Sequence, residues 1–136
     1  MKLQVGVKAL IQNNQGTYLM LHRAATMANE SEAHWDIPGG RIEPEEALND
    51  ALKREILEET GLEVNSKPKL LCAQDIFVPS ADLHVVRLTY VMQGEGNVTI
   101  SHEHQDTRWV TREEALALNL DPYLRNALEN QKTPIS

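Results

Sequence analysis

The chain has 136 residues, 41% of them apolar, which suits a single globular domain over residues 1–136 and leaves little room for a second domain. The formal net charge of −7 argues against binding polymeric nucleic acid through phosphate contacts. A small polyanion stays compatible with this charge if metal ions lie between it and the protein. The chain opens with no signal segment and has no apolar run near the roughly 18 residues that span a bilayer, so we expect a cytoplasmic protein without a membrane partner.

The first third of the chain predicts a hairpin and a loop. Apolar residues alternate along the first segment, and turn residues separate it from the next. The expected order is strand 3–11, turn 13–16, strand 17–22 and a polar loop over 27–33. Trp35 and a sharp bend at Pro38-Gly39-Gly40 follow.

An acidic helix is expected after this bend. Pro44 fits its first turn, Glu45 and Glu46 suit the positive end of the helix dipole, and Gly61 marks its C-terminal end. At about 100° per residue, four apolar side chains gather on one face, which is predicted to point to the core. These residues are Leu48, Ala51, Leu52 and Ile56.

Three glutamates of this helix, Glu55, Glu58 and Glu59, stand at spacing i, i+3 and i+4 and fall in or at the edge of the inward face. They also lie in the last turns, where the dipole disfavours each anion by about 0.3–1 kcal/mol. A solvated acidic face would avoid both positions. A salt-bridge cluster is the other alternative, but Lys53 points away and Arg54 is expected to reach Glu58 at most. The favoured interpretation is an oxygen-ligand site for a hard divalent cation.

The second half of the chain predicts further strands and two short helices. Strands are expected over 70–78, 83–92 and around 108–110, with turns at 79–82 and 94–97. Thr111 and Glu114 form a capping box for a short helix, and Asp121-Pro122 begins the last helix. The fold class is therefore α+β, with mixed strands and about three helices.

Residues 40–62 resemble an intact Nudix box. The match consists of Gly40, Glu46, Arg54-Glu55, Glu58-Glu59 and Gly61 at the family's spacing, with apolar residues between them. The resemblance implies an α/β/α sandwich around a mixed sheet. It also implies hydrolysis of a phosphoanhydride in a nucleoside diphosphate linked to another group, X.

The resemblance further implies roles for individual residues. Glu55, Glu58, Glu59 and the carbonyl of Gly40 would hold Mg²⁺ or Mn²⁺. Arg54 and Glu46 would position the helix and loop, Gly39 would serve the bend, and Arg23 is a candidate phosphate contact or else a solvated arginine. Glu103 is a candidate metal ligand or base, with an exposed loop glutamate as the alternative. The water proton would pass to a box glutamate or to Glu103.

Other reactive or aromatic side chains are expected to be structural. His102 and His104 are interpreted as surface histidines, because a hard-cation site needs no imidazole. The rings of Trp35, Phe77 and Tyr90 are expected in the core rather than on a base. The single cysteine, Cys72, is expected to be an inert buried thiol.

The substrate is less defined than the reaction. Gly40 comes early and leaves no room for the extra N-terminal domain common in family members that act on ADP-ribose and nucleotide sugars, which favours a nucleoside triphosphate, including oxidised or non-standard ones. ADP-ribose is the second candidate, with Pro79 near the position of a proline in such hydrolases. A nucleotide sensor without turnover is a third, disfavoured because no box glutamate is missing. The protein is expected to be a monomer or a homodimer.

Overall fold

A computed structural model describes residues 1–23, 34–100 and 104–131 of the chain. Seven strands, three α-helices and one 3₁₀ turn form in the described part. In chain order they are β1 (Lys2–Gln12), β2 (Tyr18–Arg23), β3 (His34–Asp36), β4 (Gly39–Arg41), α1 (Leu48–Thr60), β5 (Lys69–Val78), η1 (Pro79–Ala81), β6 (Leu83–Gln93), β7 (His104–Val110), α2 (Arg112–Leu116) and α3 (Pro122–Glu129).

All seven strands belong to one mixed sheet. Its main path runs β3-β2-β1-β6-β5, while β4 pairs with β1 and β7 pairs with β2. The predicted hairpin of β1 and β2 has one described pair, Gln12 with Tyr18. Beyond that pair, β4 takes the place beside β1, at residues 6–8. β1 and β2 therefore separate next to the Gly39-Gly40 bend, where β4 pairs with β1 instead.

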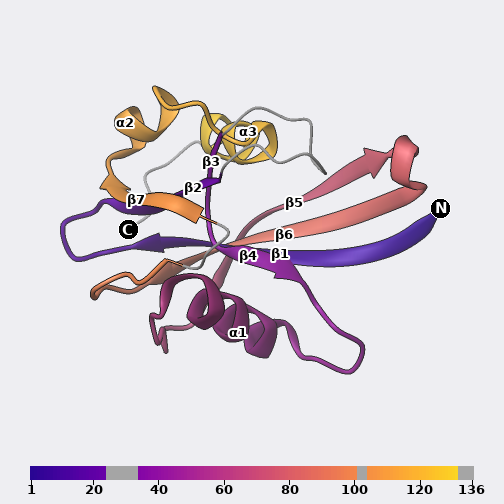
Figure 1. Ribbon diagram of the computed structural model, residues 1–136, viewed down its shortest axis with the longest axis horizontal. Coiled ribbons are helices and arrows are strands. Elements are labelled where there is room, and N and C mark those ends of the chain that lie inside the picture. The colour runs from indigo at the N-terminus through magenta and orange to yellow at the C-terminus, as the bar shows by residue number, and fades with distance from the viewer. Residues whose placement is uncertain (24–33, 101–103, 132–136) are drawn as a thin grey trace.

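The longest pairing is parallel and joins β1 to β6 along their whole lengths, from Lys2 opposite Leu83 to Gln12 opposite Gln93. Segments about eighty residues apart in the chain thus lie side by side (Figure 1). This pairing places Gly6 opposite Arg87 and fixes which side chains of β1 and β6 share a face.

Helices cover both faces of the sheet (Figure 1), which confirms the predicted α/β/α arrangement. The face under α1 buries one core, with Val7, Leu21, Leu52 and Ile56 among its members. On the other face, α2 and α3 cover a second core that includes Leu10, Met20, Leu124 and Leu128. The two cores hold the sheet between the helices, as expected when each sheet face must be buried.

The acidic helix begins later than predicted. Its first residue is Leu48 and its N-cap is Ala47, so Pro44, Glu45 and Glu46 precede it. Glu45 has a φ of 68°, a left-handed conformation that is incompatible with an α-helix, so the helix begins only after this residue. Leu48 is 36% exposed, so its expected burial was wrong for this residue. Of the four predicted core positions, the other three are buried.

The ends of the other helices agree with the sequence. Thr111 and Glu114 form the predicted capping box of α2. Asp121 caps α3 by accepting hydrogen bonds from the N–H groups of Tyr123 and Leu124. At the end of α1, Gly61 adopts a φ of 74° and donates its N–H to the carbonyl of Leu57. This left-handed cap is the conformation that favours glycine.

Candidate active site

The three glutamates of α1 differ in exposure. Glu59 is buried, with 7% of its surface exposed, and the Glu55 side chain is 13% exposed. Glu58 is 58% exposed, so of the three glutamates it is the one at the edge of the inward face. On a straight helix the residue at i+3 lies on the margin of a stripe defined by i and i+4. Two carboxylates therefore face inward and the third borders solvent.

The Gly39-Gly40 bend lies directly against these two carboxylates. The N–H of Gly39 donates a 2.9 Å hydrogen bond to Oε2 of Glu59. A Cβ at Gly40 would lie 2.6 Å from Cδ of Glu55, so any larger residue would displace that carboxylate. Pairing of β4 with β1 fixes the bend in this place. The backbone of the bend and the carboxylates thus share one small volume.

The electrostatics of Glu59 are unusual. Burial raises its pKa to about 7, and the neighbouring charge of Glu55 adds to this, while the Gly39 N–H, Lys8 and Arg23 act in the opposite direction. The carboxylate is therefore poised to lose its proton near neutral pH. A buried carboxyl beside a second carboxylate is an arrangement that often marks a functional site.

Arg54 ties the acidic side chains together and reaches further than predicted. Its Nε and Nη2 donate to both carboxylate oxygens of Glu46, at 2.7 and 2.9 Å. Its Nη1 donates to Glu55 at 2.9 Å and lies 3.5 Å from Glu58. Its Nη2 also donates to the carbonyl of Arg41 at 3.2 Å. The expectation that Arg54 contacts Glu58 at most was wrong, because the turn before α1 brings Glu46 to it.

This arginine sets the ionisation of its partner. The hydrogen bond from Arg54 lowers the pKa of Glu46 to about 2, and the pair stays charged at all ordinary pH values. Glu46 also accepts a bond from the N–H of Glu43. The turn before α1 is thereby joined to the side of the helix that carries Glu55.

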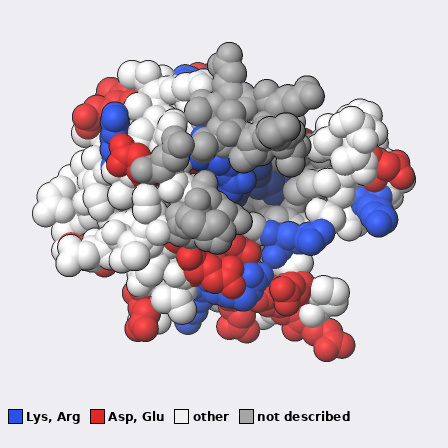
Figure 2. Space-filling view, viewed as in Figure 1, with Lys and Arg blue, Asp and Glu red and all other residues white. Residues whose placement is uncertain are grey.

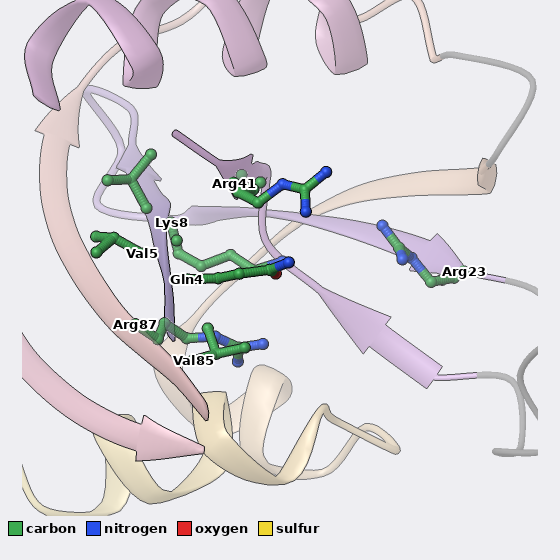
Figure 3. A pocket seen from close by; sticks show the side chains of 11 residues that line it. Gln4, Val5, Lys8, Arg23, Arg41, Val85 and Arg87 are labelled. Atoms are coloured by element: carbon green, nitrogen blue, oxygen red, sulfur yellow. The ribbon is translucent and has the colours of Figure 1, made fainter. Parts of the chain in front are cut away.

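A basic pocket adjoins the bend on its other side (Figure 3). It has a volume of about 240 Å³ and four basic side chains in its wall, Lys8, Arg23, Arg41 and Arg87. In Figure 3 Arg41 lies toward α1 and Arg87 toward the C-terminal helices. Figure 2 shows basic side chains in a hollow next to acidic side chains that gather over α1. Cations and carboxylates thus meet across the Gly39-Gly40 bend.

Two of these cations are held by buried carboxylates. Lys8 Nζ donates to Asp36 at 3.0 Å and to the carbonyl of Ile37 at 3.3 Å. Arg87 donates to Asp121 at 2.8 Å. Burial raises the pKa of Asp36, but the charges of Lys8 and Arg87 and the hydrogen bonds of Ile37 and Lys8 outweigh it, and the pKa lies below its usual value. The Asp36 carboxylate is therefore held in its charged form beside Lys8.

Arg23, a candidate phosphate contact, lines this pocket together with Gly39 and Gly40. Its Nε is buried and has no hydrogen-bond partner among the described residues. Arg23 also lies close enough to Glu59 to act on its pKa. The predicted phosphate contact is thus brought next to the glutamates, with a donor available.

Other predictions had mixed outcomes. Glu103 and His102 lie outside the described residues. His104 is 7% exposed, so its interpretation as a surface histidine was wrong; it begins β7 and pairs with Arg23. Phe77 is 58% exposed and stacks on His84, so it is no core residue, whereas Trp35 is buried. Cys72 is a free, half-buried thiol whose pKa burial raises.

Convergence of possible metal ligands also differs from the prediction. Within the described residues, the one group of three side chains whose ligand atoms all lie within 4.8 Å of one another is His34, Asp36 and Asp121. The glutamates of α1 form no such group. Arg54 draws Glu55 and Glu58 toward itself, and Glu58 extends to solvent. Asp36 and Asp121 are in turn engaged by Lys8 and Arg87.

Three pocket residues, Lys8, Arg41 and Arg87, were missed from the sequence. The sequence carries a signal for Lys8, because a lysine in the middle of an alternating apolar strand implies a buried partner or a ligand. For Arg41 and Arg87 the sequence carries no such signal. Their place in the pocket depends on the pairing of β4 and β6 with β1.

Comparison with known proteins identifies the family. The family model of the NUDIX domain matches residues 2–131. The chain belongs to the Nudix family. It is 34% identical to nucleoside triphosphatase NudI of Enterobacter sp. (strain 638), with 92% of this chain and 94% of the relative covered. It is 31% identical to CTP pyrophosphohydrolase of Escherichia coli (strain K12), with 90% and 86% covered.

Solved structures agree with the fold of this Nudix hydrolase. The crystal structure of the MutT protein from Methanosarcina mazei Go1 superposes with a TM-score of 0.81 at 28% identity, covering 93% of this chain and 91% of that one. The solution structure of the E. coli ORF135 protein gives a TM-score of 0.79 at 30% identity, covering 95% of this chain and 88% of that one.

A search of the described helices for a membrane span found none of sufficient length and apolar character.

Proposed function

We propose that this Nudix hydrolase is a metal-dependent nucleotide pyrophosphohydrolase that converts a nucleoside triphosphate to the monophosphate and pyrophosphate. The observation that carries the proposal is the contact of the Gly39-Gly40 bend with Glu55 and Glu59 on one side and with the basic pocket on the other. A diphosphate at this junction would have carboxylates for its metal ions and arginines for its free oxygens. The names of the two relatives support the nucleotide part of the proposal.

The residues present fit a hard divalent cation, and Nudix hydrolases generally use such ions. Glu55, Glu58, Glu59 and the carbonyl of Gly40 would hold it, because Mg²⁺ and Mn²⁺ prefer oxygen ligands. When bound, the metal would neutralise phosphate charge and acidify a water molecule. The raised pKa of Glu59 supports this assignment, since burial next to Glu55 leaves a carboxylate that a cation would stabilise.

Several residues of the chain would act by positioning others. Arg54 would hold Glu55 against the bend and, through Glu46, keep the preceding turn in place. Arg23 would donate to a phosphate oxygen. The water proton would pass to a glutamate of the box or to Glu103, and Glu103 is also a proposed ligand. The described residues leave both alternatives open.

A triphosphate is favoured over ADP-ribose as substrate. The relative with the higher identity is named for nucleoside triphosphates, and Arg23 and Arg41 beside the bend suit a chain of phosphates better than a neutral ribose. ADP-ribose and nucleotide sugars are the second candidates. A sensor without turnover would keep the pocket but would show no product.

A substrate panel with controlled metal tests the proposal. Triphosphates, ADP-ribose, nucleotide sugars and dinucleoside polyphosphates would be incubated with Mg²⁺, with a chelator and with restored Mg²⁺ or Mn²⁺. We expect hydrolysis of triphosphates that disappears with the chelator and returns with metal. Full turnover after rigorous metal removal would refute the metal-dependent mechanism, and binding without product would favour the sensor.

A further inference from the structure

The floor of the basic pocket is formed by Gln4, Gly6 and Lys8 of β1 with Val85 and Arg87 of β6. The register places Gly6 opposite both Arg41 and Arg87, so the three residues form one row across the sheet. A Cβ on Gly6 would have its nearest neighbours at 3.6 and 3.8 Å, ordinary contact distances. A Cβ on Gly6 would thus fit against the carbonyl of Gly40 and the side chain of Val85 without a clash, in the row between the two arginines.

The floor offers hydrogen-bond donors with little net charge. Lys8 uses two of its three N–H groups on Asp36 and Ile37, which leaves one for a ligand. Arg87 is paired with Asp121 and keeps further N–H groups. The two carboxylates neutralise these cations from behind the lining. Among the described residues, no carboxylate forms a salt bridge with Arg23 or Arg41, which lie next to the bend.

Acceptors are scarce on this floor. No carboxylate belongs to the described lining, and the Gln4 amide is the one neutral side chain there with an acceptor oxygen. A carbonyl group of a ligand would find donors on Lys8 and Arg87. An amino group in the same place would face other donors and stay unpaired, which is costly in a desolvated site.

Size and lining indicate a heterocyclic ring rather than a phosphate on the floor. The volume of about 240 Å³ lies below the roughly 300–1,000 Å³ of sites that hold a whole drug-sized ligand, so the pocket takes one part of a nucleotide. Val85, opposite Gln4 on the floor, supplies apolar contact for a ring (Figure 3). Phosphates have the stronger attraction of Arg23 and Arg41, which lie beside the bend.

We propose that the floor binds the carbonyl-bearing edge of a nucleobase, so that the enzyme selects bases with an oxo group over their amino counterparts. Uracil and hypoxanthine are such oxo bases, and cytosine and adenine carry an amino group at the corresponding position. This inference rests on the proposed function, because it assigns the base of the same nucleotide to the pocket.

Two matched pairs of triphosphates test the preference. The bases of UTP and CTP differ in the oxo or amino group and in the proton on the adjacent ring nitrogen, and the bases of ITP and ATP differ in the same way. We expect kcat/KM to be at least about tenfold higher for UTP than for CTP and for ITP than for ATP. Equal values, or a preference for CTP like that in the name of the E. coli relative, would overturn the inference.

Binding of products separates this inference from the proposed function. UMP is expected to bind at least about tenfold more tightly than CMP in calorimetric titrations, whether or not any triphosphate is hydrolysed. If no triphosphate yields monophosphate and pyrophosphate, the proposed function fails while this comparison still decides the base preference. Equal binding of UMP and CMP would refute the base preference in an active enzyme.

Variants locate the preference on the floor. Arg87→Gln replaces a pure donor with a side chain that also accepts, and Asp121 keeps its bonds to the N–H groups of α3. We expect the UTP to CTP ratio to fall toward one, while the exposed control Lys53→Gln leaves it unchanged. An unchanged ratio in Arg87→Gln would contradict the assignment.

Gly6→Val should fill the pocket and weaken UMP binding with the melting temperature retained. Undiminished binding of UMP would also contradict the assignment of the base to the floor.

Discussion

Gly39 and Gly40 are neighbours with different reasons to be glycine. A Cβ on Gly39 would lie 2.1 Å from the backbone oxygen of Val7 and 2.8 Å from Cα of Lys8, and backbone cannot yield easily. For a Cβ on Gly40 the three nearest atoms belong to the carboxylate of Glu55, the movable end of a side chain. The first glycine is thus required by the sheet and the second by the site.

The matched variants Gly39→Ala and Gly40→Ala test this difference. We expect Gly39→Ala to lower the free energy of unfolding by about 1–3 kcal/mol, as overpacking does. Gly40→Ala should keep its stability and lose most activity, because the Glu55 carboxylate is displaced. Denaturant unfolding and initial rates measure the two effects. Equal stability losses in both variants would contradict the assignment.

Glu59 predicts a pH dependence of stability. Its pKa is about 7 in the folded protein, above the ordinary value of 4.5, so the folded state binds the proton more tightly than the unfolded state. The stabilisation by this proton is complete below the unfolded pKa and is lost as pH rises through about 7. Glu59→Gln has no carboxyl group to ionise, so the variant does not lose this stabilisation as pH rises. Without metal, the variant should gain stability relative to the wild type between about pH 5 and pH 8, by at most on the order of 3 kcal/mol.

Unfolding curves in a chelator at several pH values measure this gain. The same variant should lose most catalysis, since Gln cannot supply a charged oxygen to a cation. A variant that fails to fold would indicate instead that Glu59 belongs to a structural salt-bridge network. A stability difference that is constant with pH would contradict the raised pKa.

At the scale of elements, Arg54 joins α1 to the turn before it. Its guanidinium contacts both oxygens of Glu46 and one oxygen of Glu55, a fork that an ammonium cannot reproduce. Arg54→Lys should therefore reduce metal affinity or kcat by about 10–100-fold while the fold is retained. Titration with Mn²⁺ and steady-state rates are the measurements. Lys53→Arg, on the exposed side of α1, is the control, and an unaltered Arg54→Lys enzyme would refute the positioning role.

The sequence predicts α1 well in its middle and poorly at its start. Periodicity identified Ala51, Leu52 and Ile56 as buried, because helical packing repeats every 3.6 residues. The preference of proline for the first helical turn predicted Pro44 in that position. However, Glu45 adopts a left-handed conformation and Glu46 binds Arg54, so the helix begins later. Side-chain contacts that hold a turn are not encoded in periodicity.

At the scale of the whole molecule, the sequence predicts the strands but not the partners of each strand. Local alternation showed β1 and β6, whereas their parallel pairing depends on how the entire sheet packs. That pairing brings Lys8 and Arg87 into one pocket. The glutamates of α1, in contrast, lie within one short motif. This part of the candidate site could therefore be predicted from the sequence, whereas the pairing that forms the basic pocket could not.

The positive charge of the molecule is divided between one pocket and the rest of the chain. Four of the thirteen Lys and Arg residues line the basic pocket, and Figure 2 shows basic side chains in a hollow next to acidic side chains over α1. The net charge of the chain is −7. The positive charge in the pocket can attract the phosphates of a nucleotide.

The central claim is that water attacks a phosphoanhydride inside the triphosphate chain without a covalent enzyme intermediate. The direct test is one turnover of a nucleoside triphosphate with Mg²⁺ in ¹⁸O-labelled water, followed by mass analysis of both products. We predict nucleoside monophosphate and pyrophosphate, with one ¹⁸O atom in only one of them. Release of terminal orthophosphate alone, or a trapped phospho-enzyme, would contradict this account of the chemistry.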